Sequence, residues 1–419
     1  MTKTNETRTA TSKLKPTHMI LTLTGILGLV LFILACRPSW SPDSQKVLYS
    51  YWDDASKKAA VAVFDRKTRT SRIIFEWWDE LGSSSRISAA QWTKDGERAI
   101  VTIYEEKGVQ LLSLPMSIPG AAQAYTLKKM DETFMLPYPE ANKNLFLAGG
   151  EMIIKVNLEN GAIFRKEAED DLNVLLYDAG NQVLYLRRIE KQAPKPETTK
   201  SSEGKSEKPA AQTKEPDKPL ETVEAYEFGE LDQKDLSLHP RAIVKAEELK
   251  AKGIGDLSGL ADANATGSKL ATTDEKEGNR WGVVVIGADG VEQSLKADAN
   301  DKPHKLGNPQ WSRDEKTIYV TALIDDPGTK KSEFAVLEVA TDGRNVRKDR
   351  IEERASEDFD SDYLPNAQIA LSPDGKCIAV TNGHLEKVRP ERRGLFLLDL
   401  SKPERPVKFY PAPALPVAK

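Results

Sequence analysis

Residues 40–49 have the sequence WSPDSQKVLY, and the same pattern returns three times further along the chain. The copies are WTKDGERAIV at 92–101, WSRDEKTIYV at 311–320 and LSPDGKCIAV at 371–380, where leucine replaces the tryptophan. A small polar residue followed by Pro, Asp and Gly suits a type I turn, because proline presets its backbone angle and glycine tolerates the exit geometry. Each copy therefore predicts a short apolar strand, a tight turn and a second apolar strand.

Recurrence of one strand–turn–strand pattern indicates a repeat architecture. Alignment on the turn gives seven units, and four-stranded units repeated around a ring are typical of a β-propeller. Without the first 36 residues and a polar tract at 191–220, roughly 350 residues remain, which allows seven or eight blades at about 40–50 residues each. We therefore expect an all-β, seven-bladed propeller over residues 37–419, with eight blades as the alternative.

The fifth unit is the least regular of the seven. Strands are predicted at 268–272 and 281–286, with a turn at Ala288-Asp289-Gly290, but no copy of the turn pattern is recognised before them. Asn264-Ala265-Thr266 spells a glycosylation sequon there, which we interpret as incidental.

The repeated turn resembles that of TolB-type propellers, whose units are also called WD40-like or PD40 repeats. Four of the seven units carry a clear copy, and the resemblance covers residues 37–410. In that family the units coincide with blades and begin at the innermost strand. The resemblance therefore implies that the last strand, near Phe409, stays in its own blade, and that the ring closes by packing between blades one and seven.

The N-terminal segment has the pattern of an export signal. Residues 1–18 form a basic leader, and residues 19–35 carry no charge, which predicts a cytoplasmic leader followed by an apolar anchor. The run ends in Ile33-Leu34-Ala35-Cys36, which resembles a bacterial lipobox and makes Cys36 a lipidation candidate. Residues 19–36 are thus a lipoprotein signal, an uncleaved signal anchor or a cleaved secretory signal, and each of these exports the propeller.

Two further segments interrupt the repeats. Residues 191–220 are rich in Lys, Glu, Pro, Ser and Thr and hold one leucine and no aromatic residue, a composition that predicts a disordered insertion. Residues 240–252 are predicted to form a short helix, with Pro240 at its start and Gly253 at its end. On a propeller topology the insertion opens onto the face that carries the connections between blades.

Seven residues of the repeats are interpreted as structural. The tryptophans act as wedges between blades and the aspartates belong to the turns; they are Trp40, Trp92, Trp311, Asp43, Asp95, Asp314 and Asp374. The adjacent Trp77 and Trp78 face opposite sides of a strand, so at most one of them is fully buried. The other is a candidate for a ligand-facing surface.

The sequence offers little for catalysis or metal binding. The histidines His18, His239, His304 and His384 have no second ligand at metal-binding spacing, and no G-x-S-x-G nucleophile elbow occurs. We therefore expect no enzyme activity, no catalytic residue, no metal and no cofactor. The net charge of −4 comes without a basic stripe, which argues against nucleic-acid binding. Cys377 lies in an apolar strand and is predicted to be a buried free thiol.

These observations favour a non-catalytic propeller that is anchored in the cell envelope and serves as a scaffold for protein–protein interaction. Its expected partners are the membrane, through the N-terminal anchor, and an unidentified envelope protein. The alternative is a small-ligand or glycan-binding protein, or an enzyme, that uses a mouth of the central tunnel. The family resemblance adds an accessory role in a secretion or Tol-like complex as a third hypothesis.

Overall fold

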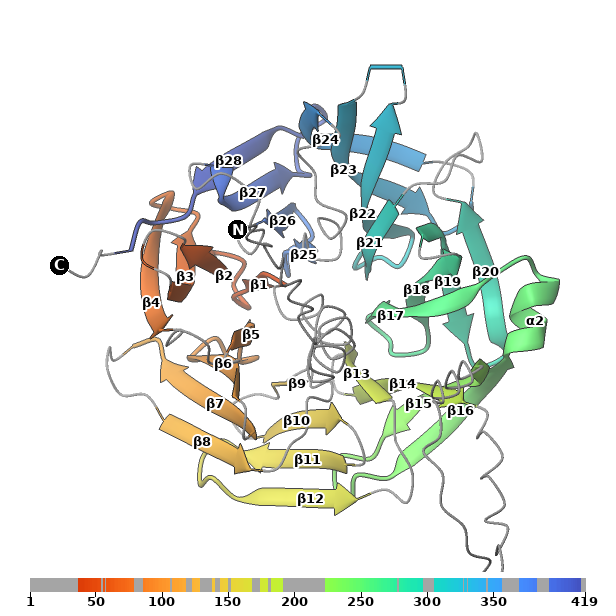
Figure 1. The fold of residues 1–419 in the computed structure, drawn as a ribbon, viewed down its shortest axis with the longest axis horizontal. Helices are drawn as coiled ribbons and strands as arrows, with labels where there is room; N and C mark the ends of the chain where they lie inside the picture. Colours follow the sequence, from red (N-terminus) through yellow and green to blue (C-terminus); the bar gives the residue numbers. More distant parts are fainter. Residues whose placement is uncertain are drawn as a thin grey trace, which may run out of the picture.

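The computed structural model describes residues 37–53, 56, 58–78, 86–105, 108–117, 123–128, 138–139, 144–149, 152–167, 174–179, 182–190, 223–276, 279–296, 305–326, 328–329, 331–343, 346–355, 369–382 and 392–415. The predicted leader, the anchor with Cys36 and the predicted insertion 191–220 lie outside the described residues. Within them, the chain forms seven four-stranded antiparallel sheets arranged as blades around an axis (Figure 1). The predicted seven-bladed propeller is confirmed.

Each blade takes four consecutive strands, from the axis outward. Blades one to three contain β1 (Ser39–Trp40), β2 (Lys46–Asp53), β3 (Lys58–Asp65), β4 (Thr70–Trp78); β5 (Arg86–Trp92), β6 (Arg98–Glu105), β7 (Gly108–Pro115), β8 (Gln123–Lys128); and β9 (Tyr138–Pro139), β10 (Asn144–Gly149), β11 (Met152–Asn157), β12 (Ile163–Glu167).

The remaining four blades follow the same order. They contain β13 (Val174–Ala179), β14 (Gln182–Glu190), β15 (Val223–Leu231), β16 (Leu238–Lys245); β17 (Asp256–Ala263), β18 (Leu270–Lys276), β19 (Asn279–Gly287), β20 (Gly290–Lys296); β21 (Lys305–Trp311), β22 (Thr317–Asp326), β23 (Lys331–Ala340), β24 (Val346–Ala355); and β25 (Ile369–Leu371), β26 (Cys377–Thr381), β27 (Gly394–Asp399), β28 (Val407–Pro411).

Each interface between neighbouring blades holds its own hydrophobic cluster. Successive strand residues point to opposite faces, so Val47 and Tyr49 pack toward blade seven while Leu48 packs toward blade two. All three are 0% exposed. The middle strands are therefore apolar on both faces, which is why they appear in the sequence as continuous apolar runs.

The ring closes without a shared strand. Strands β25 to β28 make up blade seven by themselves, and blade one begins at β1, as the resemblance to TolB-type propellers implied. The Trp40 indole Nε1–H donates to the Ala370 carbonyl of blade seven at 2.7 Å. After β28 the chain continues across blade one, where the Tyr51 hydroxyl donates to the Pro413 carbonyl at 2.7 Å and Leu415 joins the cluster between the two blades.

The predicted helix over 240–252 is wrong in its first half. Residues 240–245 belong to β16, and the helix is α2 (Ala246–Ala251). Ala242 and Val244 are buried while Ile243 is 55% exposed, which is the two-residue period of a strand. Pro240 is tolerated because β16 is the outermost strand and its pairing is irregular between Phe228 and Gly229. Among the described residues, no helix has the length and apolar character needed to cross a membrane.

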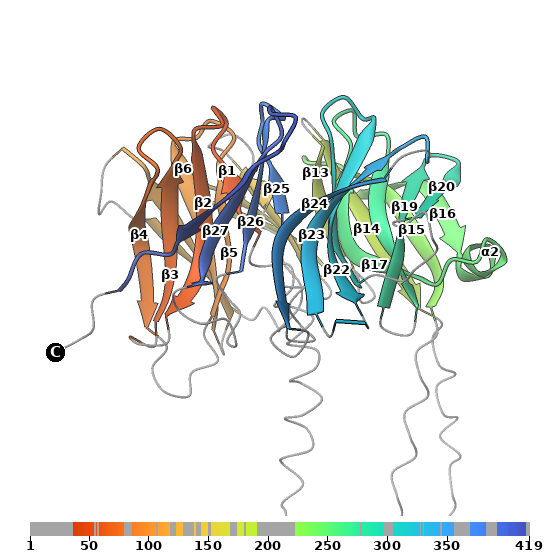
Figure 2. The ribbon, with the colours of Figure 1, turned by 90° about the horizontal axis from the view of Figure 1, so that it is seen from above.

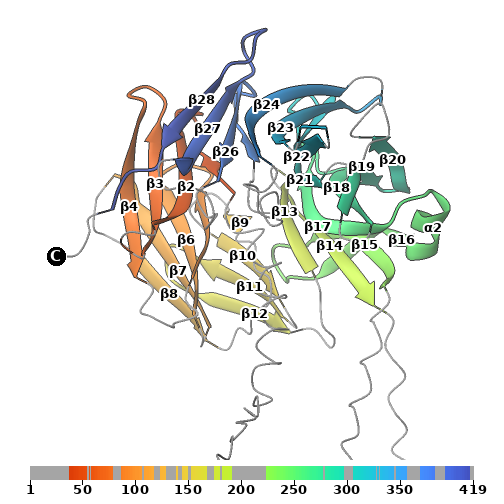
Figure 3. The ribbon, with the colours of Figure 1, turned by 45° about the horizontal axis from the view of Figure 1, so that its top comes forward.

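The two faces of the disc carry different kinds of connection between strands (Figures 2 and 3). Because neighbouring strands are antiparallel, the turns between strands one and two and between strands three and four of each blade share one face. We call it the short-turn face. The loops between strands two and three share the other face with the links between blades, and we call it the connection face. Glu190 and Val223, which flank the predicted insertion, lie at the connection face, as expected.

Replacement of Trp40 by phenylalanine tests the closure. Trp40→Phe leaves the Ala370 carbonyl without its buried donor, so we expect it to lower the free energy of unfolding by about 1–3 kcal/mol. Trp92→Phe is the matched control, because Trp92 is similarly buried and its Nε1 has no partner among the described residues. Chemical denaturation followed by far-UV circular dichroism measures both. Equal losses in the two variants would contradict the assigned role of the Trp40 hydrogen bond.

Candidate functional site

The repeated turns form the most regular polar array of the short-turn face. In each turn a hydroxyl donates to the aspartate two residues later, at 2.6 Å from Ser41 to Asp43 and at 2.7 Å from Thr93 to Asp95. The same bond measures 2.7 Å in Ser312–Asp314 and 2.5 Å in Ser372–Asp374. The hydroxyl in turn accepts the N–H that opens the second strand, for example that of Lys46 at 2.8 Å. Each carboxylate therefore braces its own hairpin.

Three of the turn carboxylates have a pKa below the ordinary value. The Ser41 hydroxyl lowers the pKa of Asp43 below its ordinary value of 3.8, and the Ser312 hydroxyl does the same for Asp314. Burial works to raise the pKa of Asp374, but the Ser372 hydroxyl, the Lys376 N–H and the charge of Arg66 outweigh it and lower that pKa as well. The short-turn face thus displays fixed negative charges at neutral pH.

A fifth turn of the same kind lies in blade five, where the sequence pattern is not recognisable. The Lys269 N–H donates to the Asn264 side-chain oxygen at 2.8 Å, and the Gly267 N–H donates to the Asn264 carbonyl at 3.0 Å. Asn264 thus takes the place of the serine, and Thr266 takes the place of the aspartate. Since Asn264 is 0% exposed, the sequon is a structural turn. Gly267, which corresponds to Gly96 and Gly375 of the other turns, is the sequence signal that could have revealed this turn.

A second set of hydrogen bonds joins the innermost strands of successive blades. The donor is the backbone N–H of the residue at the tryptophan position of one blade. The acceptor is a side chain of the previous blade, from the residue just before the equivalent position there. The distances are 3.1 Å from Trp92 to Ser39 Oγ, 2.9 Å from Trp311 to Asp262 Oδ2 and 2.5 Å from Leu371 to Gln310 Oε1. The acceptors differ in chemistry, so no single-residue motif reveals them. Trp311 also donates its indole N–H to the Asp262 carbonyl at 3.1 Å.

Arg37 lies inside this inner ring, just ahead of β1. Its Nε donates to the Ile369 carbonyl of blade seven at 3.1 Å, and its guanidinium lies 3.5 Å from Asp262 Oδ1 of blade five. Asp262 also accepts the Trp311 N–H, so it carries bonds from two neighbours. Arg37 and Asp262 therefore form a charged pair near the axis, between the segment ahead of β1 and the inner strand β17.

The two adjacent tryptophans do not converge with this pair. Trp77 packs at the boundary of blades one and two and stacks on Phe75 with ring centroids 6.2 Å apart. Trp78 ends β4, and its side chain lies outside what the structure describes. Their role as a ligand-facing surface stays a prediction.

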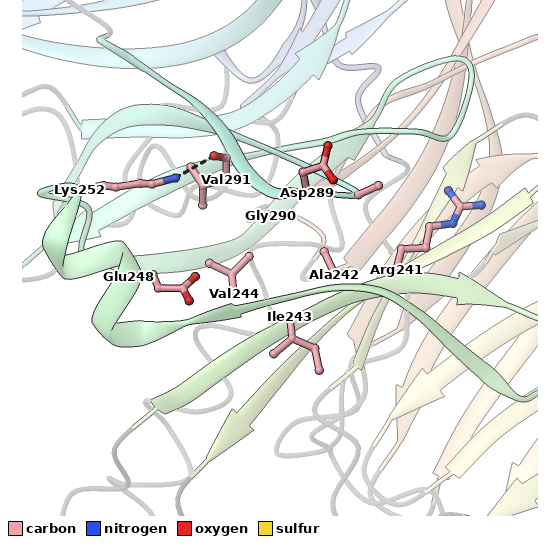
Figure 4. A pocket seen from close by; sticks show the side chains of 10 residues that line it. Arg241, Ala242, Ile243, Val244, Glu248, Lys252, Asp289, Gly290 and Val291 are labelled. Atoms are coloured by element: carbon pink, nitrogen blue, oxygen red, sulfur yellow. Dashed lines mark hydrogen bonds between the residues drawn. The ribbon is translucent and has the colours of Figure 1, made fainter.

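A shallow groove lies on the rim between blades four and five (Figure 4). Its cavity of about 340 Å³ is lined by Arg241, Ala242, Ile243, Val244, Glu248, Lys252, Ala288, Asp289, Gly290 and Val291. Arg241 is engaged by Glu230, Gln182 and the Gly267 carbonyl, and Lys252 donates to the Val291 carbonyl at 2.9 Å. The charged side chains thus hold α2 and the two blades together.

One Asp–Ser–His cluster invites a comparison with nucleophilic catalysis. The Ser237 hydroxyl donates to Asp235 at 2.5 Å and lies 3.1 Å from His239 Nε2. The single hydroxyl proton is directed at the aspartate, so His239 donates to the serine and cannot act as its general base. Both bonds lie at the exposed surface, where they stabilise the turn before β16.

Metal binding and thiol chemistry can also be assessed for the described residues. No group of three His, Cys, Asp or Glu side chains among them is arranged to hold a metal ion. Cys377 is a buried free thiol, and burial raises its pKa to about 12. Its reactivity is therefore low at neutral pH.

Comparison with known proteins finds similarity in fold and none in sequence family. No family model matches the chain, and no curated protein matches its sequence. Among solved structures, TolB from Acinetobacter baumannii is similar with a TM-score of 0.43 at 13% identity, over 74% of this chain and 64% of the TolB chain. The match thus spans less than two thirds of TolB.

Two further structures are similar to the same degree. The β-propeller domain of the Trilobed protease from Pyrococcus furiosus has a TM-score of 0.46 at 11% identity, over 74% of this chain and 79% of that domain. The oligogalacturonate lyase from Vibrio parahaemolyticus has a TM-score of 0.48 at 10% identity, over 87% and 84%. At such identities the likeness concerns the fold alone, and the expected resemblance to TolB-type propellers is confirmed at that level.

The braced turns predict a pH dependence of stability. Asp43, Asp314 and Asp374 have lowered pKa values in the folded chain, while the unfolded chain keeps the ordinary value. Their contribution to stability is therefore present above that ordinary value and is lost as the pH falls through the folded-state pKa values. The triple variant Asp43→Asn, Asp314→Asn, Asp374→Asn lacks this contribution at every pH.

We expect the difference in thermal midpoint between the wild type and the triple variant to be full at pH 7 and to shrink below about pH 4. Thermal unfolding followed by circular dichroism at pH 7, 5, 4 and 3 measures it. A difference that stays constant across this range would show that the carboxylates do not act through their charge.

Proposed function

We propose that the protein is an envelope-anchored, non-catalytic propeller that binds another envelope protein through its short-turn face. The observation that carries this proposal is the array of braced turns. Four turns hold their aspartates in the same way around the ring, and a fifth, at Asn264, repeats the backbone geometry. A surface of this kind is fixed before a partner arrives.

Rigidity supports recognition because association otherwise has to order loops and side chains. Side-chain ordering costs about 0.5–1.5 kcal/mol for each immobilised flexible side chain at an interface. The turn residues have already lost this freedom on folding. The array therefore favours a macromolecular partner that covers several blades at once.

Charge supports selectivity at the same face. The turns mix both signs, because the charges of Lys46, Lys316 and Lys376 act on the carboxylates of Asp43, Asp314 and Asp374, and Lys67 is exposed on the same face in the turn between β3 and β4. A mixed pattern sets the register of a partner through complementary charges and disfavours wrong partners. It also keeps the face hydrated when no partner is bound.

A second candidate function is the binding of a small ligand at the tunnel mouth. The observation in its favour is the charged pair Arg37–Asp262 near the axis. The bonds of this pair to Ile369 and Trp311 favour a structural role, so we rank this function below protein binding. Calorimetric titration of acidic and neutral sugars into the wild type and Asp262→Asn would separate the two functions.

Photo-crosslinking tests the proposed docking face. A photoreactive amino acid placed at Lys67 or Lys316, both on the short-turn face, should give a discrete adduct with one envelope protein in intact cells. The matched positions are Arg165 in β12 and Lys408 in β28, which are exposed on outermost strands. They should give no such adduct, because the outer strands are not part of the docking face.

Charge reversal at the same positions completes this test. Lys67→Glu with Lys316→Glu should reduce co-purification of the captured protein at least about tenfold, which corresponds to about 1.4 kcal/mol, and should leave the thermal midpoint unchanged. Gentle solubilisation that yields no stoichiometric partner, or equal loss with Arg165→Glu and Lys408→Glu, would contradict the proposal.

A further inference from the structure

One position of the second strand carries a buried hydroxyl in several blades. Nine residues after the hydroxyl of the repeated turn stand Thr102, Thr321 and Thr381. In blade five, nine residues after Asn264, which replaces that hydroxyl, stands Thr273. All four threonines are 0% exposed. The same polar group therefore recurs in the middle of strands that are otherwise apolar.

These hydroxyls point into the apolar seams between blades. Thr321 stands between Tyr319 and Leu323, which both belong to the hydrophobic cluster of blades six and seven. Because side chains alternate along a strand, Thr321 faces that seam as well. By the same alternation, Thr102 faces blade three and Thr273 faces blade six. Each hydroxyl is thus surrounded by groups that offer it no hydrogen bond.

Three of the four hydroxyls have no partner within the described part of the chain. The Oγ1 atoms of Thr102, Thr273 and Thr321 make no hydrogen bond there. Thr381 differs, because its hydroxyl donates to the Gly394 carbonyl at 3.4 Å. A buried hydroxyl without a hydrogen bond destabilises the folded state, and native proteins satisfy nearly all such groups. The three hydroxyls therefore call for a partner that the strands themselves do not supply.

An irregularity of the innermost strand accompanies each of these three hydroxyls. The pairing of β21 with β22 shifts between Leu306 and Pro309, opposite Thr321. The pairing of β17 with β18 shifts opposite Thr273, and that of β5 with β6 shifts next to Thr102. The pairs of β25 with β26 in blade seven continue without a shift. Extra residues at a bulge disrupt the ladder and leave backbone groups unpaired.

The bulge of blade six contains a second unpartnered group. Asn308 lies in this bulge, opposite Thr321, and is 5% exposed. Its Oδ1 accepts no hydrogen bond from the described residues. The Thr321 hydroxyl can both donate and accept, whereas the amide oxygen only accepts. Two buried oxygen atoms with complementary needs therefore lie at one bulge.

We propose that the bulges of blades two, five and six each bind an internal water molecule, held by Thr102, Thr273 and Thr321. A buried water makes about three hydrogen bonds to polar groups that are otherwise unsatisfied. The threonine hydroxyl and the unpaired backbone groups of the bulge supply these bonds, and Asn308 adds an acceptor in blade six. Each water completes the pairing of the first and second strands, close to the axis (Figure 1). These sites lie inside the disc and do not depend on the proposed docking function.

Replacement of threonine by valine tests the three sites through the sign of its effect. Valine has nearly the shape of threonine but lacks the hydroxyl. In the triple variant Thr102→Val, Thr273→Val, Thr321→Val each bound water loses one partner, so we expect the thermal midpoint of the full-length chain to fall by at least about 2 °C. Circular dichroism measures it.

A midpoint that rises or does not change would show that the hydroxyls are unsatisfied, because valine then removes a buried polar group that made no bond. That result would overturn the proposal. Thr381→Val is the matched control, because it loses a bond to a protein carbonyl. Its midpoint should fall irrespective of the three water sites, which shows that the assay detects the loss of one buried hydroxyl bond.

A crystal structure of the wild-type protein, at a resolution that reveals ordered water, tests the sites without any substitution. We expect a water peak within about 3.2 Å of each of the three hydroxyl oxygens, and in blade six a second contact from that water to Asn308 Oδ1. A direct bond from one of these hydroxyls to a protein acceptor, or no density beside it, would overturn the site in that blade.

Discussion

The constraint on which this structure depends is that a four-stranded blade cannot bury either face alone. Every middle strand is apolar on both sides, so each blade needs a neighbour on the left and another on the right. In an open stack the first and last blades would each expose one apolar face. In a closed ring every blade has two neighbours, and the seven hydrophobic clusters between blades bury the apolar faces of all seven sheets.

The seam between blades one and seven is where this requirement is hardest to meet, because β1 and β28 lie at opposite ends of the described chain and no link between blades joins them. Three kinds of contact take the place of such a link. Trp40 bonds to the inner strand of blade seven, and Arg66 joins Trp40 to Asp374 on the short-turn face. The segment after β28 covers blade one through Pro413 and Leu415. The seam is thus held at the axis, at one face and at the rim.

The sequence predicted the blades well because the turn pattern repeats the same chemistry at the same spacing. Serine or threonine, aspartate and a preceding tryptophan each have a fixed place in the structure, so four copies were enough to predict the fold, and the blade number was predicted as seven with eight as the alternative. Blade five was predicted less well, since Asn264 and Thr266 replace the serine and aspartate while making the same bonds. The helix was placed too early, because Pro240 suggested a helix start where an outermost strand tolerates it.

The polar contacts between blades could not be predicted from one sequence. Ser39, Asp262 and Gln310 serve one purpose with three different acceptor groups. Arg405 bridges blades seven and six through Glu338 and Asp349, residues that are distant in the chain and ordinary in type. The candidate docking face has the same origin, because its rigidity arises from hydrogen bonds that only the folded turns bring together.

Amide hydrogen exchange of the Leu415→Ala variant tests most directly whether side-chain packing at the seam closes the ring. Leu415 is 5% exposed and belongs to the cluster between blades one and seven. The account predicts that protection falls mainly in β2, β26 and β27, while β18 and β19 in blade five keep theirs. Unchanged protection at the seam, or an equal loss in all blades, would contradict it.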